Sequence, residues 1–128
     1  MMCLSRSACL TWIVAAIWLS PAQATTPPID CRAAKSVVDR TICQSAEFVA
    51  MDREIAALYD RGLADFEPAD RHRLAQSQIT FLRRRSGCAW AAHHSAHPGV
   101  AVGECIRSAM EDRLNGLRRV VERGGYGR

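Results

Sequence analysis

Residues 47–66 read EFVAMDREIAALYDRGLADF, and this stretch decides the fold. Its apolar side chains recur three or four residues apart, at Phe48, Met51, Ile55, Leu58, Tyr59, Leu63 and Phe66. That spacing predicts an amphipathic helix of about twenty residues with one apolar stripe. Ser45 precedes it as a candidate N-cap. A helix with one apolar face must bury that face against other elements, so the rest of the chain is expected to supply them.

Three further helices are predicted on either side of this stretch. A short one follows Ser36 and runs to about Cys43, with Val38 and Ile42 on one face. After a break at Glu67–Asp70, where Pro68 suits a turn or the first turn of a helix, another runs from about Ala69 to Arg85. Its stripe holds Leu74, Gln78, Phe81 and Arg85, with Ala75, Ile79 and Leu82 beside it. The last spans roughly Gly103 to Glu122, with Ile106, Met110, Leu114, Leu117 and Val121 as its core face.

No stretch alternates apolar and polar residues for long enough to indicate a half-buried strand. The short connections between the predicted helices favour antiparallel neighbours. We therefore expect an all-α fold, a small disulfide-stapled bundle of three to four antiparallel helices. Gly87, the histidines and Pro98-Gly99 indicate one longer loop between Cys88 and Cys105.

The first 24 residues have the order of a secretory signal peptide. Arg6 precedes an apolar run from Ala8 to Leu19, and small residues Ala22 and Ala24 stand just before the expected cut. This run of twelve residues, interrupted only by Thr11, is shorter than the roughly 20 apolar residues that span a bilayer. No membrane span is therefore expected after cleavage. The expected organisation is a signal peptide at 1–24, an extended leader at 25–30, one helical domain at 31–123 and a flexible tail at 124–128. The expected location is periplasmic or secreted.

Four cysteines remain after signal cleavage: Cys31, Cys43, Cys88 and Cys105. An even number in a small exported domain predicts two disulfides. Spacing alone allows three pairings. We favour Cys31 with Cys43 and Cys88 with Cys105, because each pair would close a short loop at one end of a helical hairpin. A zinc site is the alternative, but the cysteines lack C-x-x-C spacing.

The charge of the exported part is mildly positive. It keeps 16 basic and 13 acidic residues, a net charge of +3, and fifteen of the basic residues are arginine. This is too weak a charge to indicate a nucleic-acid partner, and an anionic envelope polymer suits the expected compartment better. Arg83, Arg84 and Arg85 point in different directions on a helix, so a solvated face explains most of this run.

Four blocks combine the cysteines with polar and apolar residues at set spacings. They are Cys31, Asp39 and Ile42-Cys43; Phe48, Met51-Asp52, Ile55 and Tyr59; Gln78, Phe81-Leu82, Arg85 and Cys88; and Cys105-Ile106, Arg113 and Leu117. Together they resemble the LprI-type lysozyme-inhibitor-like domain family of exported bacterial proteins. The chain departs from the family pattern at Phe81, Ser86 and Met110, where tryptophan, aspartate and tyrosine are common. The resemblance covers nearly all of the exported part.

The polar residues that the resemblance fixes on otherwise apolar faces are Asp52, Gln78, Arg85 and Arg113. A charge that faces a core must be paired, so we expect a structural network in which Asp52 pairs with Arg85 or with Arg113. The alternative is a recognition patch for a partner.

The predicted loop carries Trp90, His93, His94 and His97. Its small residues and Pro98-Gly99 favour a solvated loop, and it is also the segment best able to protrude toward a partner. Histidines can bind zinc or copper, but we expect no metal site and no cofactor here. The chain contains no H-E-x-x-H, G-x-S-x-G or phosphate-binding glycine loop. We therefore expect a binding protein and not an enzyme.

The resemblance implies a lysozyme inhibitor that acts by protein–protein binding. A net charge of +3 gives no electrostatic steering toward a basic lysozyme, so inhibition would depend on local complementarity. The alternative is an interaction or envelope-stress protein that binds another exported protein or an anionic envelope polymer.

Overall fold

Four α-helices and one 3₁₀-helix account for most of the described chain. The computed structural model describes residues 25–127, so the predicted signal peptide lies outside the described residues. The elements are α1 (Val37–Cys43), α2 (Ala46–Asp65), α3 (Pro68–Gly87), η1 (Cys88–His94) and α4 (Pro98–Arg123). No strand occurs between residues 25 and 127. The all-α prediction is confirmed.

Local sequence explains where the helices begin. The Ser36 hydroxyl accepts a hydrogen bond from the Asp39 N–H at 2.9 Å, and the Ser45 hydroxyl accepts one from the Phe48 N–H at 3.3 Å. Each satisfies an N–H group that has no partner within its own helix. Pro68 occupies the first turn of α3, where its missing N–H costs nothing.

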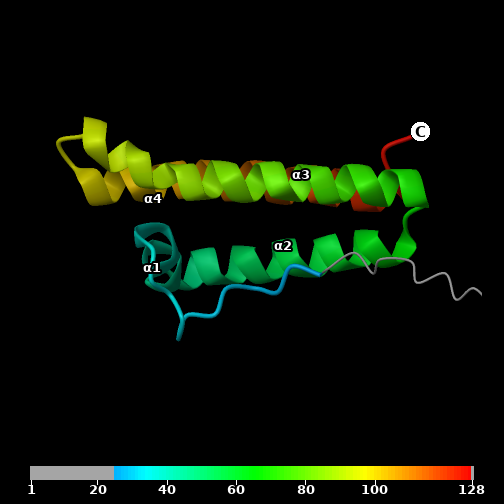
Figure 1. Ribbon diagram of the computed structural model, residues 1–128, viewed down its shortest axis with the longest axis horizontal. Helices are drawn as coiled ribbons and strands as arrows, with labels where there is room; N and C mark the ends of the chain where they lie inside the picture. Colours follow the sequence, from blue (N-terminus) through cyan, green and yellow to red (C-terminus); the bar gives the residue numbers. More distant parts are fainter. Residues whose placement is uncertain (1–24, 128) are drawn as a thin grey trace, which may run out of the picture.

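The three long helices lie side by side along the long axis of the molecule (Figure 1). Consecutive long helices are antiparallel, so α2 and α4 run in the same direction. Helix α1 lies at the end of the bundle where α2 begins, and it contacts both α4 and η1 there. This end therefore combines α1 with the connection between α3 and α4.

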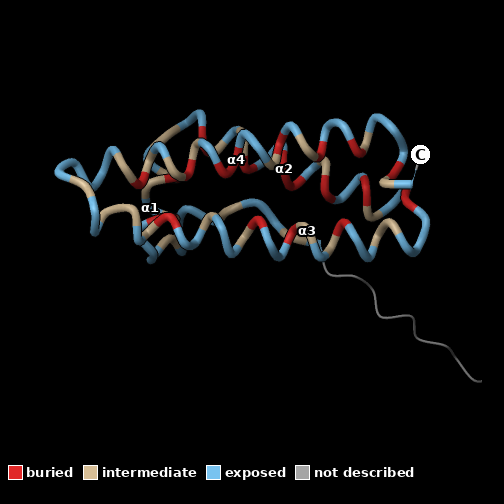
Figure 2. Tube along the Cα trace, turned by 90° about the horizontal axis from the view of Figure 1, so that it is seen from above, coloured by how far each residue is buried: buried red, intermediate tan, exposed pale blue. Residues whose placement is uncertain are grey.

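The core lies between the long helices, and the buried positions face inward along each of them (Figure 2). Ile42, Leu74, Ile106 and Met110 are completely buried. The predicted apolar faces are thus largely confirmed. Two positions differ: Ile79 is 42% exposed, and at the end of α4 it is Val120 that is buried while Val121 only packs against the core.

Two disulfides join Cys31 to Cys43 and Cys88 to Cys105, with Cα–Cα distances of 5.6 and 5.5 Å. The favoured pairing is confirmed. The first bond ties the chain entering the bundle to the end of α1. The second ties η1 to α4 at the same end of the molecule.

The prediction of a long loop between Cys88 and Cys105 is wrong. Residues Cys88–His94 form η1, and α4 begins at Pro98, five residues before the predicted start. Proline is well suited to the first helical turn because its fixed φ matches the helix and its missing N–H is not needed there. The extra turn also buries Val102, which is 2% exposed and lies one turn before Ile106. Between Cys88 and Cys105, only residues 95–97 lie outside η1 and α4.

Both ends of the described chain pack on the helices. The extended leader lies along α2, and Ile29 is partly buried against the core. Beyond α4, Gly124 adopts a left-handed conformation with φ of 75° and closes the helix. Residues 124–128 were predicted to be a flexible tail, but Tyr126 packs edge-on against Phe66, with 6.4 Å between ring centroids.

None of the helices between residues 25 and 127 combines the length and the apolar character that a membrane crossing requires.

Candidate functional site

The buried ion pair between Asp52 and Arg85 joins α2 to α3. Arg85 Nη1 donates to Asp52 Oδ1 at 2.6 Å, and the two side chains are 14% and 7% exposed. The other oxygen, Oδ2, accepts a hydrogen bond from the Ile29 N–H at 2.6 Å. One carboxylate therefore holds together two helices and the extended leader. This is one of the two pairings that the sequence predicted.

Arg113 on α4 has different partners. Its Nε and Nη2 donate to Gln78 Oε1 at 3.1 and 2.7 Å, and its Nη1 donates to Ser77 Oγ at 2.9 Å. Burial lowers the pKa of Arg113 from its ordinary value, while Tyr126 and Tyr59 act in the opposite direction. The four predicted polar residues thus come together as two pairs. Asp52 pairs with Arg85, and Gln78 with Arg113.

The ring of Phe81 lies between the two pairs. The guanidinium carbons of Arg85 and Arg113 lie 5.4 and 5.8 Å from the ring centroid. A guanidinium within about 6 Å of an aromatic face is attracted by the ring quadrupole. Phe81 therefore stabilises both guanidinium groups and also fills part of the core.

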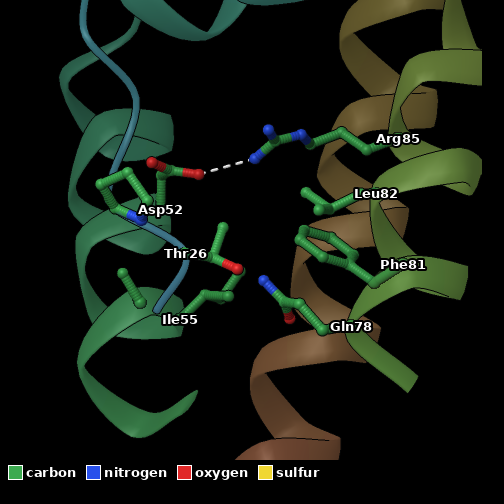
Figure 3. Close-up of a pocket in the computed structure, with 9 residues that line it drawn as sticks. Thr26, Asp52, Ile55, Gln78, Phe81, Leu82 and Arg85 are labelled. Carbon is green, nitrogen blue, oxygen red and sulfur yellow. Dashed lines mark hydrogen bonds and ion pairs between the residues drawn. The ribbon is translucent and has the colours of Figure 1, made fainter. Parts of the chain in front are cut away.

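A small cavity lies beside the Asp52–Arg85 pair, under the leader (Figure 3). Its volume is about 20 Å³. A cavity of that size holds about one water molecule. The side chain of Gln78 reaches it from α3, with the amide nitrogen directed toward Thr26. This cavity is too small for a substrate. The contacts of Asp52 instead connect α2 to α3 and to the leader.

The residues of the predicted partner-binding loop lie at the end of the bundle, on η1 and the segment after it. Trp90 is 70% exposed, and its ring lies beside that of His93, with 5.2 Å between centroids. His93, His94 and His97 are also exposed. In the described part of the chain, no group of three or more His, Cys, Asp or Glu side chains is placed to hold a metal ion.

Sequence reasoning missed three participants in the polar network. They are the Ile29 N–H, the Ser77 hydroxyl and the Tyr126 hydroxyl, which lies 3.2 Å from Ser77 Oγ. Ser77 sits next to Gln78 on α3, so its position offered a weak signal. The other two come from chain ends that carry no periodic pattern.

Neither the family models, nor the curated proteins, nor the solved structures that were compared include a match to this chain. The class of the protein is therefore set by its fold alone: a disulfide-stapled all-α bundle whose three long helices are held together by buried polar pairs.

Proposed function

We propose that this protein is a non-catalytic, exported binding protein that contacts its partner through the end of the bundle formed by Cys88–His97. The observation that carries the proposal is the 70% exposure of Trp90 within a short helix. Tryptophan is enriched among the residues that dominate binding energy at interfaces. A partner that covers so large an apolar side chain gains the free energy of removing its surface from water.

The helix that carries Trp90 is cross-linked to α4, which favours binding by lowering the ordering cost. Cys88 is completely buried and bonded to Cys105. Two residues further along α4, Arg107 makes two hydrogen bonds to the carboxylate of Glu47 at 2.5 and 3.0 Å. The Arg107 hydrogen bond lowers the pKa of Glu47, and the guanidinium lies 5.1 Å from the Phe48 ring centroid.

The resemblance to lysozyme inhibitors supports a lysozyme as the first partner to test. Such enzymes act through two carboxylates in a cleft. The exposed His93, His94 and His97 carry ring N–H donors that suit such a target. Binding would depend on this local complementarity, because a net charge of +3 does not steer the protein toward a basic enzyme. We place this binding in the periplasm or outside the cell.

The test is a cell-wall lysis assay with the oxidised protein purified after export. We expect near-stoichiometric inhibition of the lysozyme, weakened at least about tenfold by Trp90→Ala. The free energy of unfolding of Trp90→Ala should stay within about 0.5 kcal/mol of the unchanged protein, as for most exposed positions. Ile79→Ala is the matched control, because Ile79 is an exposed apolar residue on α3. It should inhibit normally.

Three results would contradict parts of this proposal. Absence of inhibition at about tenfold molar excess removes that lysozyme as the partner. Binding to peptidoglycan or lipopolysaccharide that weakens steeply with salt would favour the alternative of an anionic envelope polymer. If Trp90→Ala inhibits as well as the unchanged protein, the end of the bundle is not the contact surface.

A further inference from the structure

Arg113 differs from the other arginines that reach across to a neighbouring helix. Four such arginines donate to a carboxylate: Arg84 to Asp112, Arg85 to Asp52, Arg107 to Glu47 and Arg118 to Glu54. Among residues 25–127, Arg113 donates only to uncharged oxygens, those of Gln78 and Ser77. No carboxylate among the described residues lies within ion-pair distance of the Arg113 guanidinium.

A negative group beside Arg113 would stabilise its charge further. Burial disfavours an isolated charge, and the lowered pKa of Arg113 has burial as its largest cause. A guanidinium has five N–H donors. Three of them are used by Gln78 and Ser77, which leaves two for the nearby Tyr126 hydroxyl and for a ligand.

A groove between α3 and α4 opens onto Arg113. Its volume is about 210 Å³, below the roughly 300–1,000 Å³ of sites for drug-sized ligands, so any occupant must be compact. Ser77 and Thr80 supply hydroxyl groups, while Ala109 and Gly116 line it without polar side chains. A Cβ added to Gly116 would meet nothing within 4 Å, so the glycine leaves this part of the groove open.

We propose that this groove binds a small monocarboxylate. The carboxylate would pair with Arg113. The hydroxyl of Thr80, which donates to the Gln76 carbonyl at 3.1 Å, would turn to donate to the ligand instead. The apolar body would lie along Ala109 and Gly116. Asp112 and Arg84 also line the groove, and they are paired with each other at 2.8 Å. This leaves the single positive charge of Arg113, which suits a monocarboxylate better than a dianion such as phosphate. The site shares no residue with the Trp90 end, so it is independent of the proposed partner binding.

The test is an NMR titration of the oxidised, exported protein with two carboxylates. Benzoate represents a small-molecule carboxylate, and N-acetylalanine represents the C-terminus of a peptide. Saturable shifts are expected at the Ser77 and Thr80 amides and at the Arg113 Nε–H. The acid that binds more tightly identifies the source of the carboxylate. Benzamide, which has the same shape without the charge, should bind at least about tenfold more weakly. Inorganic phosphate should also bind more weakly.

Variants separate this site from general surface binding. Gly116→Leu fills the groove and should abolish the shifts. Gly103→Leu is the matched control, since Gly103 is also on α4, also has open space at its Cβ and lies outside the groove. Arg113→Lys keeps the charge but loses the planar donor set, and should weaken benzoate binding by about tenfold.

The proposal is overturned if neither carboxylate gives saturable shifts at these positions. Equal binding of benzamide, tighter binding of phosphate than of both acids, or binding that survives in folded Gly116→Leu would also overturn it. If Gly116→Leu does not fold, Thr80→Val decides the matter. Thr80 is exposed, so replacing its hydroxyl should not unfold the protein. Unchanged benzoate affinity in both Thr80→Val and Arg113→Lys would exclude the site.

Discussion

Asp52 on α2 and Arg85 on α3 form a buried ion pair, with 2.6 Å between Oδ1 and Nη1. The other oxygen of the carboxylate accepts a hydrogen bond from the Ile29 N–H, so Asp52 contacts both α3 and the leader. Burying two charges costs several kcal/mol per ion, and the pair offsets that cost only while both partners are present. Loss of one partner should therefore cost far more than loss of an exposed charge.

Asp52→Ala is expected to lower the free energy of unfolding by about 3–5 kcal/mol, because it leaves Arg85 buried without a counter-charge. Urea unfolding of the oxidised protein measures this change. Asp60→Ala is the matched control: Asp60 is an exposed aspartate on the same helix and should change stability by about 0.5 kcal/mol or less. A cost for Asp52→Ala no larger than that of the control would contradict the role assigned to the pair.

Gly62→Ala is expected to destabilise the protein although alanine is the better helix former. An added Cβ at Gly62 would lie 2.6 Å from Leu74 Cδ2 and 3.3 Å from Phe66 Cε2. Leu74 is completely buried and cannot move aside without disturbing the core. Overpacking typically costs about 1–3 kcal/mol, which exceeds the gain of about 1 kcal/mol from helix propensity.

Gly116→Ala is expected to stabilise the protein, because a Cβ at this position meets nothing within 4 Å. This variant should gain up to about 1 kcal/mol. Thermal or urea unfolding of the two variants under the same conditions compares them directly. Equal stabilisation of both would show that α2 and α3 do not approach as closely at Gly62 as the structure indicates.

Tyr59 should make stability depend on pH in the alkaline range. Burial raises the pKa of Tyr59 above its ordinary value of 10.0. The stabilising contribution is complete below the pKa of the unfolded chain. It is lost as the pH rises through the folded pKa, because the unfolded chain releases the tyrosine proton first. Unfolding should therefore become easier above about pH 10.

The comparison with Tyr59→Phe isolates this effect, since every other titrating group is common to both proteins. The free energies of unfolding are measured at about pH 9 and about pH 11. The unchanged protein should lose more stability over this range than Tyr59→Phe does. Parallel losses would mean that the hydroxyl of Tyr59 titrates alike in the folded and unfolded chains.

The fold could be predicted from the sequence because its signals are local. Phe48, Ile55 and Tyr59 of the predicted stripe are buried on α2, and the other apolar residues of that stripe on the helix pack against the core. The predicted positions from Ile106 to Leu117 are all buried on α4. The start of α4 was missed because Pro98-Gly99 was interpreted as a loop. A proline in the first turn fits a helix equally well, and Val102, four residues before Ile106, continued the apolar face.

The polar site could be predicted only in part. Facing positions on two helices indicated that Asp52 needs an arginine, but helix periodicity does not say which of Arg85 and Arg113 is closer. That choice depends on how α2, α3 and α4 rotate about their axes when they pack. The contacts of Ile29 and Tyr126 depend on the paths of irregular segments, for which sequence spacing gives no rule.

The docking of Tyr126 against α3 gives a final prediction. Its N–H donates to Asp70 Oδ2 at 3.0 Å, its hydroxyl lies 3.2 Å from Ser77 Oγ, and its ring packs on Phe66. Tyr126→Phe removes only the hydroxyl contact and should cost about 0.5–1.5 kcal/mol in urea unfolding. Tyr126→Ala also removes the ring, whose aromatic contact adds about 0.5–1.5 kcal/mol beyond its buried area, so it should cost more.

The same two variants distinguish a packed chain end from a free one. Ser77 also holds Arg113, so loss of the Tyr126 ring should speed amide hydrogen exchange near Ser77 as well as near the end of α4. Tyr126→Phe should have a smaller effect on exchange at both places. If Tyr126→Ala matches the unchanged protein in stability and in exchange, the chain after Gly124 behaves as the flexible tail that its composition predicted, and Ser77 and Arg113 are held without it.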